Sequence, residues 1–191
     1  KRYLSDVQDG LVPVTLFQRG FAGDNADAKQ ELDDLLGVKR AVDYPKPHLL
    51  IRRLLQIGTN SGDSDIVLDF FAGSCTTAHA VLSQNRQDNG NRRFIMVQLP
   101  EPTDEDSTAR QAGYETIADI GRARIRQLIA RMKTQDEKKL GLYSDEDLGF
   151  KCYRLARSNY KPWQDITTPD PRQIEMAFDH FETPLVEGWQ R

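Results

Sequence analysis

The fold is decided by the stretch Asp65-Ile-Val-Leu-Asp-Phe-Phe71 and by the turn that follows it, Ala72-Gly-Ser-Cys-Thr-Thr77. Consecutive apolar residues over so short a length predict a strand that is buried on both faces, as in a parallel sheet. The small residues after it predict a tight turn. Apolar residues then recur at helical spacing, which predicts a helix that ends near Ser83.

A second buried strand is predicted over 93–99, Arg-Phe-Ile-Met-Val-Gln-Leu, after a polar loop over 84–91. Pro100 and Pro102 stop this strand, because proline has no N–H to donate to a sheet. A strand, a helix and a strand at this spacing predict a right-handed parallel crossover. The predicted fold class is therefore α/β.

Two further helices are predicted, one before this unit in the sequence and one after it. The first runs from about His48 to Ile57 after an extended entry at Tyr44-Pro-Lys-Pro47, and Gly58 has the place of a C′ residue. The second runs over 116–132 with an apolar stripe. Its other side is basic, and a solvated face explains that side at least as well as contacts with phosphate or a partner subunit. The basic residues are Arg122, Arg124, Arg126, Arg131 and Lys133.

The two ends of the chain have weaker patterns. Residues 1–42 predict short strands or loops, then one or two helical turns that end near Gly37, without a core of their own. Residues 148–155 have the composition of a strand. A loop with Lys161-Pro-Trp163 and a short helix over 174–181 are expected to follow.

Composition excludes several classes of protein. A chain of 191 residues with 38% hydrophobic residues is neither disordered nor too short for one core. No apolar run approaches the ~20 residues that span a bilayer, and no signal peptide opens the chain, so no membrane partner is expected. Two cysteines make no disulfide framework, and a reducing, cytoplasmic location is expected.

The charge balance limits how the chain could bind nucleic acid. It has 26 Lys and Arg against 29 Asp and Glu, a net charge of −3. A stand-alone binder of duplex DNA usually has a basic excess, because counterion release drives its affinity. If this chain acts on DNA, most phosphate contacts come from elsewhere.

The turn over 72–77 follows a strand end, which is where doubly wound sheets bind ligands. Small side chains let the backbone approach a ligand, and the next helix presents free N–H groups and the positive end of its dipole. The ligand group that suits such a site is a carboxylate or a phosphate. The alternative interpretation is that these residues form only a tight turn and bind no ligand. The chain has neither the Gly-x4-Gly-Lys-Ser/Thr of a P-loop nor the Gly-x-Gly-x-x-Gly of a dinucleotide site.

A more specific pattern is Asp69-Phe-Phe-Ala-Gly-Ser-Cys-Thr-Thr-Ala-His-Ala-Val81, which resembles motif I of amino-group DNA methyltransferases, Asp-x-Phe-x-Gly-Ser-Gly-Thr-Thr. Residues 44–47 with the following helix are similar to motif X, and 93–103 resemble the segment that holds motif II. Together with 120–125, these motifs resemble the Mod (modification) subunit of type III restriction–modification systems, which are adenine-specific methyltransferases. The resemblance implies a Rossmann-like, S-adenosylmethionine-dependent methyltransferase sheet, here partial, with helices on both faces.

The resemblance also implies a division of the chain and a cofactor site. Residues 1–42 would be the exit of a target-recognition region, 43–163 the S-adenosylmethionine-binding part, and 164–191 a C-terminal extension. Lys46 and Pro47 would border the methionine end of the cofactor. The strand end and loop around it would comprise Asp69, Phe70, Phe71, Ala72, Gly73 and Ser74, with Thr76 at the helix start.

Two parts of the expected site stay open. The ribose hydroxyls would be bound at the end of the second strand, where spacing favours Gln98 and the bidentate chemistry of a carboxylate favours Glu101. Cys75 stands where the family has glycine, and a left-handed backbone there would cost about 1–2 kcal/mol and could weaken cofactor binding. No metal site is expected, since His48 and His180 lack partners at ligand spacing and His79 is interpreted as a packing residue.

No catalytic residue is predicted within the chain. The family holds its flipped adenine with Asp/Asn/Ser-Pro-Pro-Tyr/Phe/Trp, which these 191 residues lack. In Mod subunits that motif lies upstream, so we expect a C-terminal piece that is inactive alone. Its expected partners are DNA through the full-length protein, a restriction (Res) subunit and a second Mod copy. The alternatives are a degenerate, non-catalytic binding or assembly module and a methyltransferase of RNA or of a small molecule.

Overall fold

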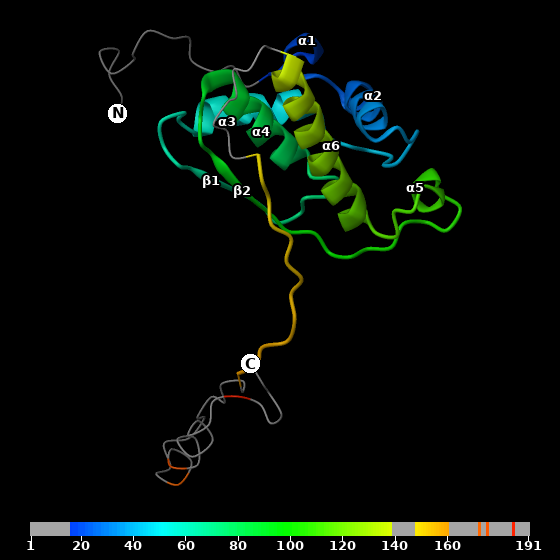
Figure 1. Cartoon of the computed structure of the whole chain (residues 1–191), viewed down its shortest axis with the longest axis vertical. Helices are drawn as coiled ribbons and strands as arrows, with labels where there is room; N and C mark the ends of the chain where they lie inside the picture. The colour runs from blue at the N-terminus through cyan, green and yellow to red at the C-terminus, as the bar shows by residue number, and fades with distance from the viewer. Residues whose placement is uncertain (1–15, 139–147, 161–171, 173–174, 176–184, 186–191) are drawn as a thin grey trace. The chain divides into compact units, whose positions relative to one another are not determined.

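The computed structural model describes residues 16–138 and 148–160, together with residues 172, 175 and 185. The chain divides into two units, Lys1–Gly149 and Phe150–Arg191. The described helices and strands all belong to the first unit (Figure 1). In chain order they are α1 (Arg19–Ala22), α2 (Asn25–Leu36), α3 (His48–Gly58), β1 (Ile66–Asp69), α4 (Thr76–Asp88), β2 (Arg93–Met96), α5 (Thr108–Gln111) and α6 (Ile117–Lys138).

The two strands form a parallel pair, which confirms the predicted α/β class and the strand–helix–strand order. Ile66 lies opposite Arg93, and the register continues to Asp69 opposite Met96. The ladder extends beyond both ends of the strands, because Arg93 N donates to Asp65 O and Val97 N donates to Asp69 O, each at 2.8 Å. The α4 helix connects the carboxyl end of β1 to the start of β2.

The described helices cover one face of this sheet and leave side chains on the other face exposed. Leu55 of α3 and Ala80 and Val81 of α4 are buried, and they pack with Val67 and Phe94 of the strands. Figure 1 shows α3 and α4 on the same side of the strands. The strand residues that point to the opposite face are at least half exposed: Ile66 at 53%, Leu68 at 57% and Ile95 at 50%.

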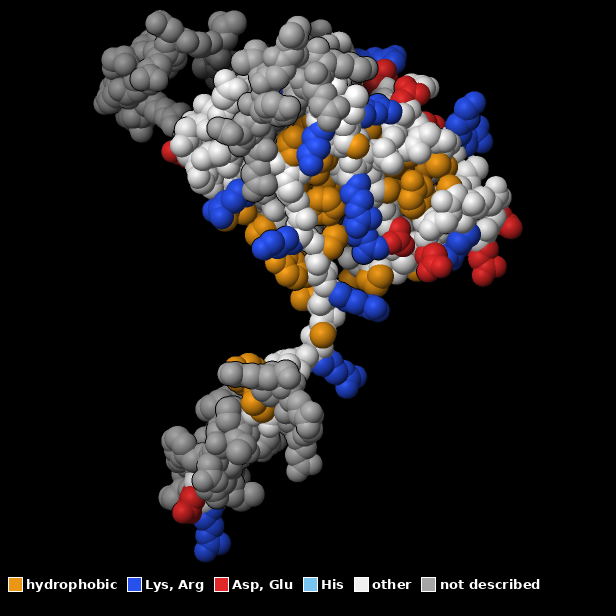
Figure 2. All heavy atoms as spheres, in the orientation of Figure 1, with side chains coloured by type: hydrophobic (Ala, Val, Ile, Leu, Met, Phe, Trp, Pro, Cys, Tyr) orange, Lys and Arg blue, Asp and Glu red, His pale blue; other side chains and the backbone are white. Residues whose placement is uncertain are grey.

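The prediction that both strands are buried on both faces is therefore wrong for the described residues. Side chains of a strand alternate between its two faces, and here helices of the described part cover only one. Figure 2 shows the uncovered apolar side chains gathered over β1 and β2. An exposed apolar face of this kind is typical of an interaction surface.

The segment before the sheet is more helical than predicted. The α2 helix has three turns rather than one or two, because Asp24 and Asp27 form a reciprocal capping box at its start. Its end is as predicted, with Gly37 in the left-handed conformation at φ +69°. The α3 helix includes Gly58 as its last residue, so the C′ prediction for that glycine is wrong.

The α4 helix continues to Asp88, so the loop predicted from residue 84 is wrong over its first five residues. Gln84 is only 3% exposed, and its amide is satisfied by partners on two helices. Its Oε1 accepts from Gln56 Nε2 at 3.2 Å, and its Nε2 donates to Asp88 at 2.9 Å. A polar residue that finds such partners supports a helix as well as an apolar one does.

The α6 helix confirms the predicted apolar stripe. The helix itself continues past its predicted end at residue 132 to Lys138. Ile120, Ile125, Leu128 and Met132 are all buried. The basic side of the helix is only partly solvated: Arg126, Arg131 and Lys133 are exposed, whereas Arg124 is fully buried.

The C-terminal predictions fare differently. No strand forms over 148–155, where Tyr153 and Leu155 are 86% and 93% exposed and have no partner strand among the described residues. The second unit has an isolated antiparallel bridge between Tyr160 and Leu185. The predicted loop at 161–163 and nearly all of the predicted helix over 174–181 lie outside the described residues. Among the helices that are described, none is long and apolar enough to cross a membrane.

Candidate functional site

The candidate site is the β1–α4 loop, residues 70–75, which joins the end of β1 to the start of α4. Two of its residues have left-handed backbones, Gly73 at φ +50° and Cys75 at φ +58°. Only glycine adopts this conformation without cost, so Cys75 carries strain of about 1–2 kcal/mol. Residue 75 therefore has the left-handed backbone that makes cysteine less favourable than the glycine of the family motif.

Asp69 closes the loop from the strand side. Its Oδ2 accepts from Thr77 Oγ1 at 2.6 Å, and its Oδ1 accepts from the N–H of Phe71 at 3.1 Å. The carboxylate therefore ties the end of β1 to the first turn of α4, where the helix dipole favours negative charge.

The two residues that follow β2 hold the loop from its other side. Ala72 N donates to Val97 O at 3.1 Å, and Gly73 N donates to Gln98 Oε1 at 2.7 Å. Gln98 is thus brought to the loop through its side chain. Among the described residues, no hydrogen bond joins the side chain of Lys46 or Glu101 to it, and both residues are exposed.

The predicted cofactor residues differ in exposure. Ala72, Ser74 and Thr76 are buried, whereas Phe70 and Phe71 are 63% and 83% exposed. Pro47 is buried at the N-terminus of α3. A Cβ built on Gly73 would meet nothing nearer than Phe71 O at 4.0 Å, so the space beside this glycine is open. A ligand can approach the backbone there.

Arg124 is the main residue of the site that sequence reasoning missed. Its Nη1 donates to Ser74 Oγ at 3.2 Å and to Thr76 Oγ1 at 2.8 Å, and its Nε donates to His79 Nδ1 at 3.3 Å. The signal was present, because Ile120, Arg124 and Leu128 follow one another every four residues on the buried side of α6. Because Arg124 is positively charged, the sequence predicts it on the basic, solvated side of the helix instead.

A half-buried carboxylate lies next to this guanidinium. Glu31 Oε1 is 3.8 Å from Arg124 Nη2 and 3.0 Å from His79 Nδ1, and Glu31 Oε2 is 2.7 Å from His48 Nδ1. Burial alone would raise the pKa of Glu31, but the hydrogen bond with His48 and the adjacent imidazole of His79 hold that pKa well below its usual range. Burial lowers the pKa of His79 to about 4, so its imidazole is neutral at pH 7.

Glu31, His48 and His79 offer three ligand atoms within 4.8 Å of one another, a set that could bind a transition metal. Their arrangement opposes this. The two imidazoles are stacked, with centroids 4.5 Å apart and planes 4° apart. A nitrogen lone pair lies in its ring plane, so one ion cannot lie in the planes of two stacked rings. Arg124 adds positive charge 3.1 Å from His79 Nδ1. The cluster is a hydrogen-bonded bridge between α2, α3 and α4.

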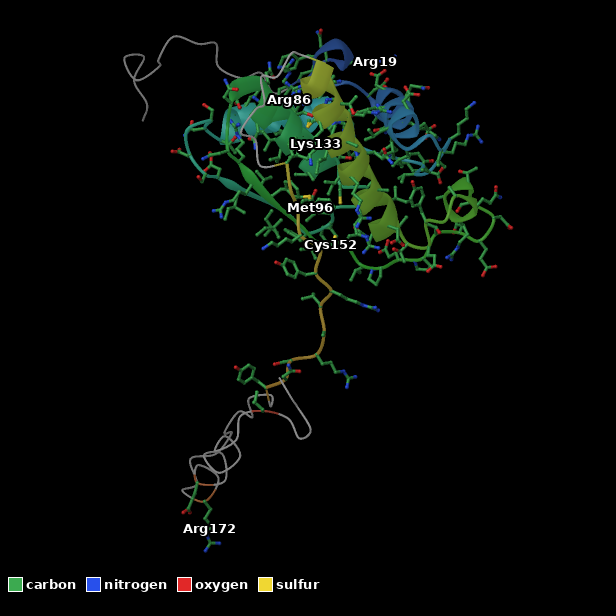
Figure 3. The ribbon with its side chains drawn as sticks, viewed as in Figure 1. Arg19, Arg86, Met96, Lys133, Cys152 and Arg172 are labelled. Carbon is green, nitrogen blue, oxygen red and sulfur yellow. The ribbon has the colours of Figure 1, made fainter. Side chains whose placement is uncertain are left out.

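An open cavity of about 580 Å³ lies between α2, α3, α4 and α6, and Glu31 and His79 are among the residues that line it. Its lining includes the side chains of Arg52, Arg131 and Arg86, the last of which is labelled in Figure 3. None of the predicted cofactor residues lines it. The candidate site at the strand ends is therefore distinct from this cavity.

Comparisons with known proteins identify several relatives of this chain. The chain is 36% identical over 157 residues to the type III restriction-modification enzyme StyLTI Mod subunit of Salmonella typhimurium, covering 82% of this chain and 22% of that protein. It is 41% identical over 150 residues to the EcoPI Mod subunit of Escherichia phage P1, covering 75% and 23%. It is 34% identical over 98 residues to the type II methyltransferase M.KpnI of Klebsiella pneumoniae, covering 51% and 23%.

The chain thus spans about a fifth of the length of the curated relatives it matches. Residues 20–118, just over half of the chain, match the DNA methylase family. This segment runs from α1 to the start of α6 and includes the β1–α4 loop. The chain therefore belongs to the DNA methylase family.

Proposed function

We propose that the chain is the cofactor-binding part of a DNA adenine N6-methyltransferase, the Mod subunit of a type III restriction–modification system. The observation that carries this proposal is the β1–α4 loop, with small side chains over 72–75, two left-handed residues and a backbone held by Val97 and Gln98 just after β2. The similarity to two Mod subunits over 82% and 75% of this chain supports the choice of system.

The proposed cofactor is S-adenosylmethionine, which would supply an electrophilic methyl group to the amine of adenine. The open space beside Gly73 and the first turn of α4 suit the carboxylate of its methionine part. Lys46 and Pro47 would border that end. Asp69, Ala72, Ser74 and Thr76 would shape the floor, and the exposed rings of Phe70 and Phe71 offer flat apolar surface beside it.

For the ribose hydroxyls we propose Glu101 rather than Gln98. The Oε1 of Gln98 is already engaged by Gly73 N at 2.7 Å, so that amide has a structural role in the loop. The side chain of Glu101 is exposed, and a carboxylate can accept from both hydroxyls at once.

The complete domain would be a Rossmann-like sheet with helices on both faces. The apolar residues on the uncovered face of β1 and β2 support this, because further helices would bury them. We retain the proposed division into 1–42, 43–163 and 164–191.

The adenine pocket would come from a part of the longer protein that these 191 residues do not contain, since they lack the Asp-Pro-Pro-Tyr type of motif. The proposed partners are therefore DNA through the full-length protein, a Res subunit and a second Mod copy. The proposed place of action is the cytoplasm, where prokaryotic DNA lies.

The test is titration calorimetry of S-adenosylmethionine into the 191-residue chain. We expect saturable binding, and we expect Glu101→Gln to weaken it about tenfold, because one charge-assisted contact is lost. Glu105→Gln is the matched control, since Glu105 is an exposed carboxylate on the same connection. A chain that does not bind the cofactor would favour a non-catalytic module.

A second assay follows methyl transfer from labelled cofactor to adenine-containing oligonucleotides. We expect no transfer by the 191-residue chain, because it lacks the adenine pocket. Transfer by the chain unaided would contradict the proposed division of the catalytic site.

A further inference from the structure

Arg124 is an unusual residue for the interior of this fold. It is fully buried, whereas Arg126, Arg131 and Lys133 of the same helix are exposed. A guanidinium stays charged, and burying a charge is unfavourable unless partners compensate for lost water. The partners of Arg124 are therefore the reason for its position.

Those partners lie on both sides of the start of α4. Ser74 belongs to the β1–α4 loop, and Thr76 is the first residue of α4. Nη1 of Arg124 donates to both hydroxyls, at 3.2 and 2.8 Å. The remaining contacts, from Nε and Nη2, go to His79 Nδ1 at 3.3 and 3.1 Å. One side chain of α6 thus contacts three residues of the loop and of the helix that follows it.

A second observation on α6 points to the same loop. Gly121 lies one turn before Arg124, and a Cβ built on it would lie 2.6 Å from Cys75 Sγ and 3.2 Å from Gly73 O. Only glycine allows the backbone of α6 to lie this close to the loop. The helix therefore contacts the loop by backbone packing at Gly121 and by hydrogen bonds at Arg124.

Within the part of the chain that the structure describes, the carboxylate that forms an ion pair with Arg124 is that of Glu31 on α2, at 3.8 Å. Glu31 in turn contacts His48 of α3 and His79 of α4. The guanidinium is thus held from α2 and α4 while it holds the loop. Because it is fully buried, it has no surface left for a ligand or for DNA phosphate.

We propose that Arg124 is a positioning residue that holds the β1–α4 loop in its cofactor-binding conformation, with Gly121 supporting the same contact. This inference rests on the proposed function of the loop. Arg124 acts through Ser74 and Thr76 and touches no reacting group itself. Its role is to keep the two left-handed residues of the loop, one of them the strained Cys75, in place.

The first measurement does not depend on the cofactor. Cys75 is buried on the loop, and Cys152 is exposed in the other unit. The rate at which a thiol reagent modifies Cys75 therefore reports opening of the loop, and the rate at Cys152 reports the reactivity of the reagent itself. We expect Arg124→Ala to raise the modification rate of Cys75 relative to Cys152 by about tenfold or more. Millimolar guanidinium should restore the protection by refilling the vacated site.

The second measurement is the affinity for S-adenosylmethionine. Arg124→Ala should weaken it about tenfold, with the same rescue by guanidinium, because the loop must be ordered again on binding. Arg126→Ala is the matched control, an exposed arginine on the same helix, and should match the wild type in both measurements.

The outcomes separate the two proposals. Unchanged Cys75 protection in a folded Arg124→Ala chain overturns the positioning role. Lost protection in a chain whose wild type binds no cofactor supports the positioning role and overturns the proposed function. If Arg124→Ala does not fold, Arg124→Lys decides: it keeps the charge but not the fork, and protection equal to the wild type would overturn the role.

Discussion

The titration of His79 provides a quantitative test of the buried cluster. Its imidazole is buried against Glu31, His48 and Arg124, and burial lowers its pKa from 6.5 to about 4. Between these two values the unfolded chain binds a proton that the folded chain does not bind. Stability therefore falls as the pH falls from about 6.5 to 4, and this imidazole contributes no further change below that range.

The size of the effect follows from the two pKa values. From pH 7 to pH 5 the difference in proton binding corresponds to about 2 kcal/mol of unfolding free energy, out of about 3 kcal/mol for the full shift. Glu31 acts with the same sign, because its pKa is lowered in the folded state, but only below its ordinary value of 4.5. Measurements at pH 5 and above therefore isolate His79.

The assay is urea unfolding followed by circular dichroism at pH 7, 6 and 5, for the wild type and for His79→Gln. Glutamine cannot titrate but keeps an amide that can donate to Glu31 and accept from Arg124. We expect the wild type to lose about 2 kcal/mol more than His79→Gln between pH 7 and pH 5, at unchanged m-values. Equal losses in the two proteins would refute a neutral, buried His79.

Three further substitutions test the loop and its surroundings. Cys75→Gly should tighten S-adenosylmethionine binding by up to about tenfold, because strain at φ +58° opposes the conformation that the site requires; calorimetry showing no gain would contradict this. Gly121→Ala should destabilise the chain by about 1–3 kcal/mol in urea unfolding, and by less when Cys75 is also glycine, since the new Cβ would lie 2.6 Å from Sγ; equal costs in both backgrounds would argue against the contact. Asp24→Ala should cost about 1 kcal/mol by the same assay, because Asp27 N loses its acceptor at 2.9 Å, and an unchanged midpoint would show that the cap is dispensable.

The parts of the fold that sequence predicted are those set by local chemistry. The strand pair, the turn between β1 and α4 and the end of α2 follow from short apolar runs and glycine, although β2 ends at Met96, three residues before its predicted end at Leu99. The parts that sequence missed depend on partners far along the chain. Gln84 can be buried in α4 because Gln56 of α3 donates a hydrogen bond to it. Arg124 can be buried in α6 because Ser74, which is 50 residues earlier in the sequence, accepts a hydrogen bond from it.

The candidate site divides in the same way. Motif I could be placed on the loop from its residues alone, and the structure puts Asp69 and Gln98 in contact with that loop. The helical spacing of Ile120, Arg124 and Leu128 could have placed Arg124 on the buried side of α6. The meeting of this arginine with a glutamate and two histidines was not predictable, because the four residues have no common spacing in the sequence. Their meeting depends on how four helices pack.

The bond between Asp69 and Thr77 closes a ring of nine residues whose two ends belong to different elements of secondary structure. A ring of this kind has no slack: one inserted or deleted residue would separate the two side chains or unwind the start of α4. Residues 61–64, just before β1, are exposed. Changes in length among homologous chains, or tags introduced by design, should therefore be tolerated ahead of the strand and rejected behind it.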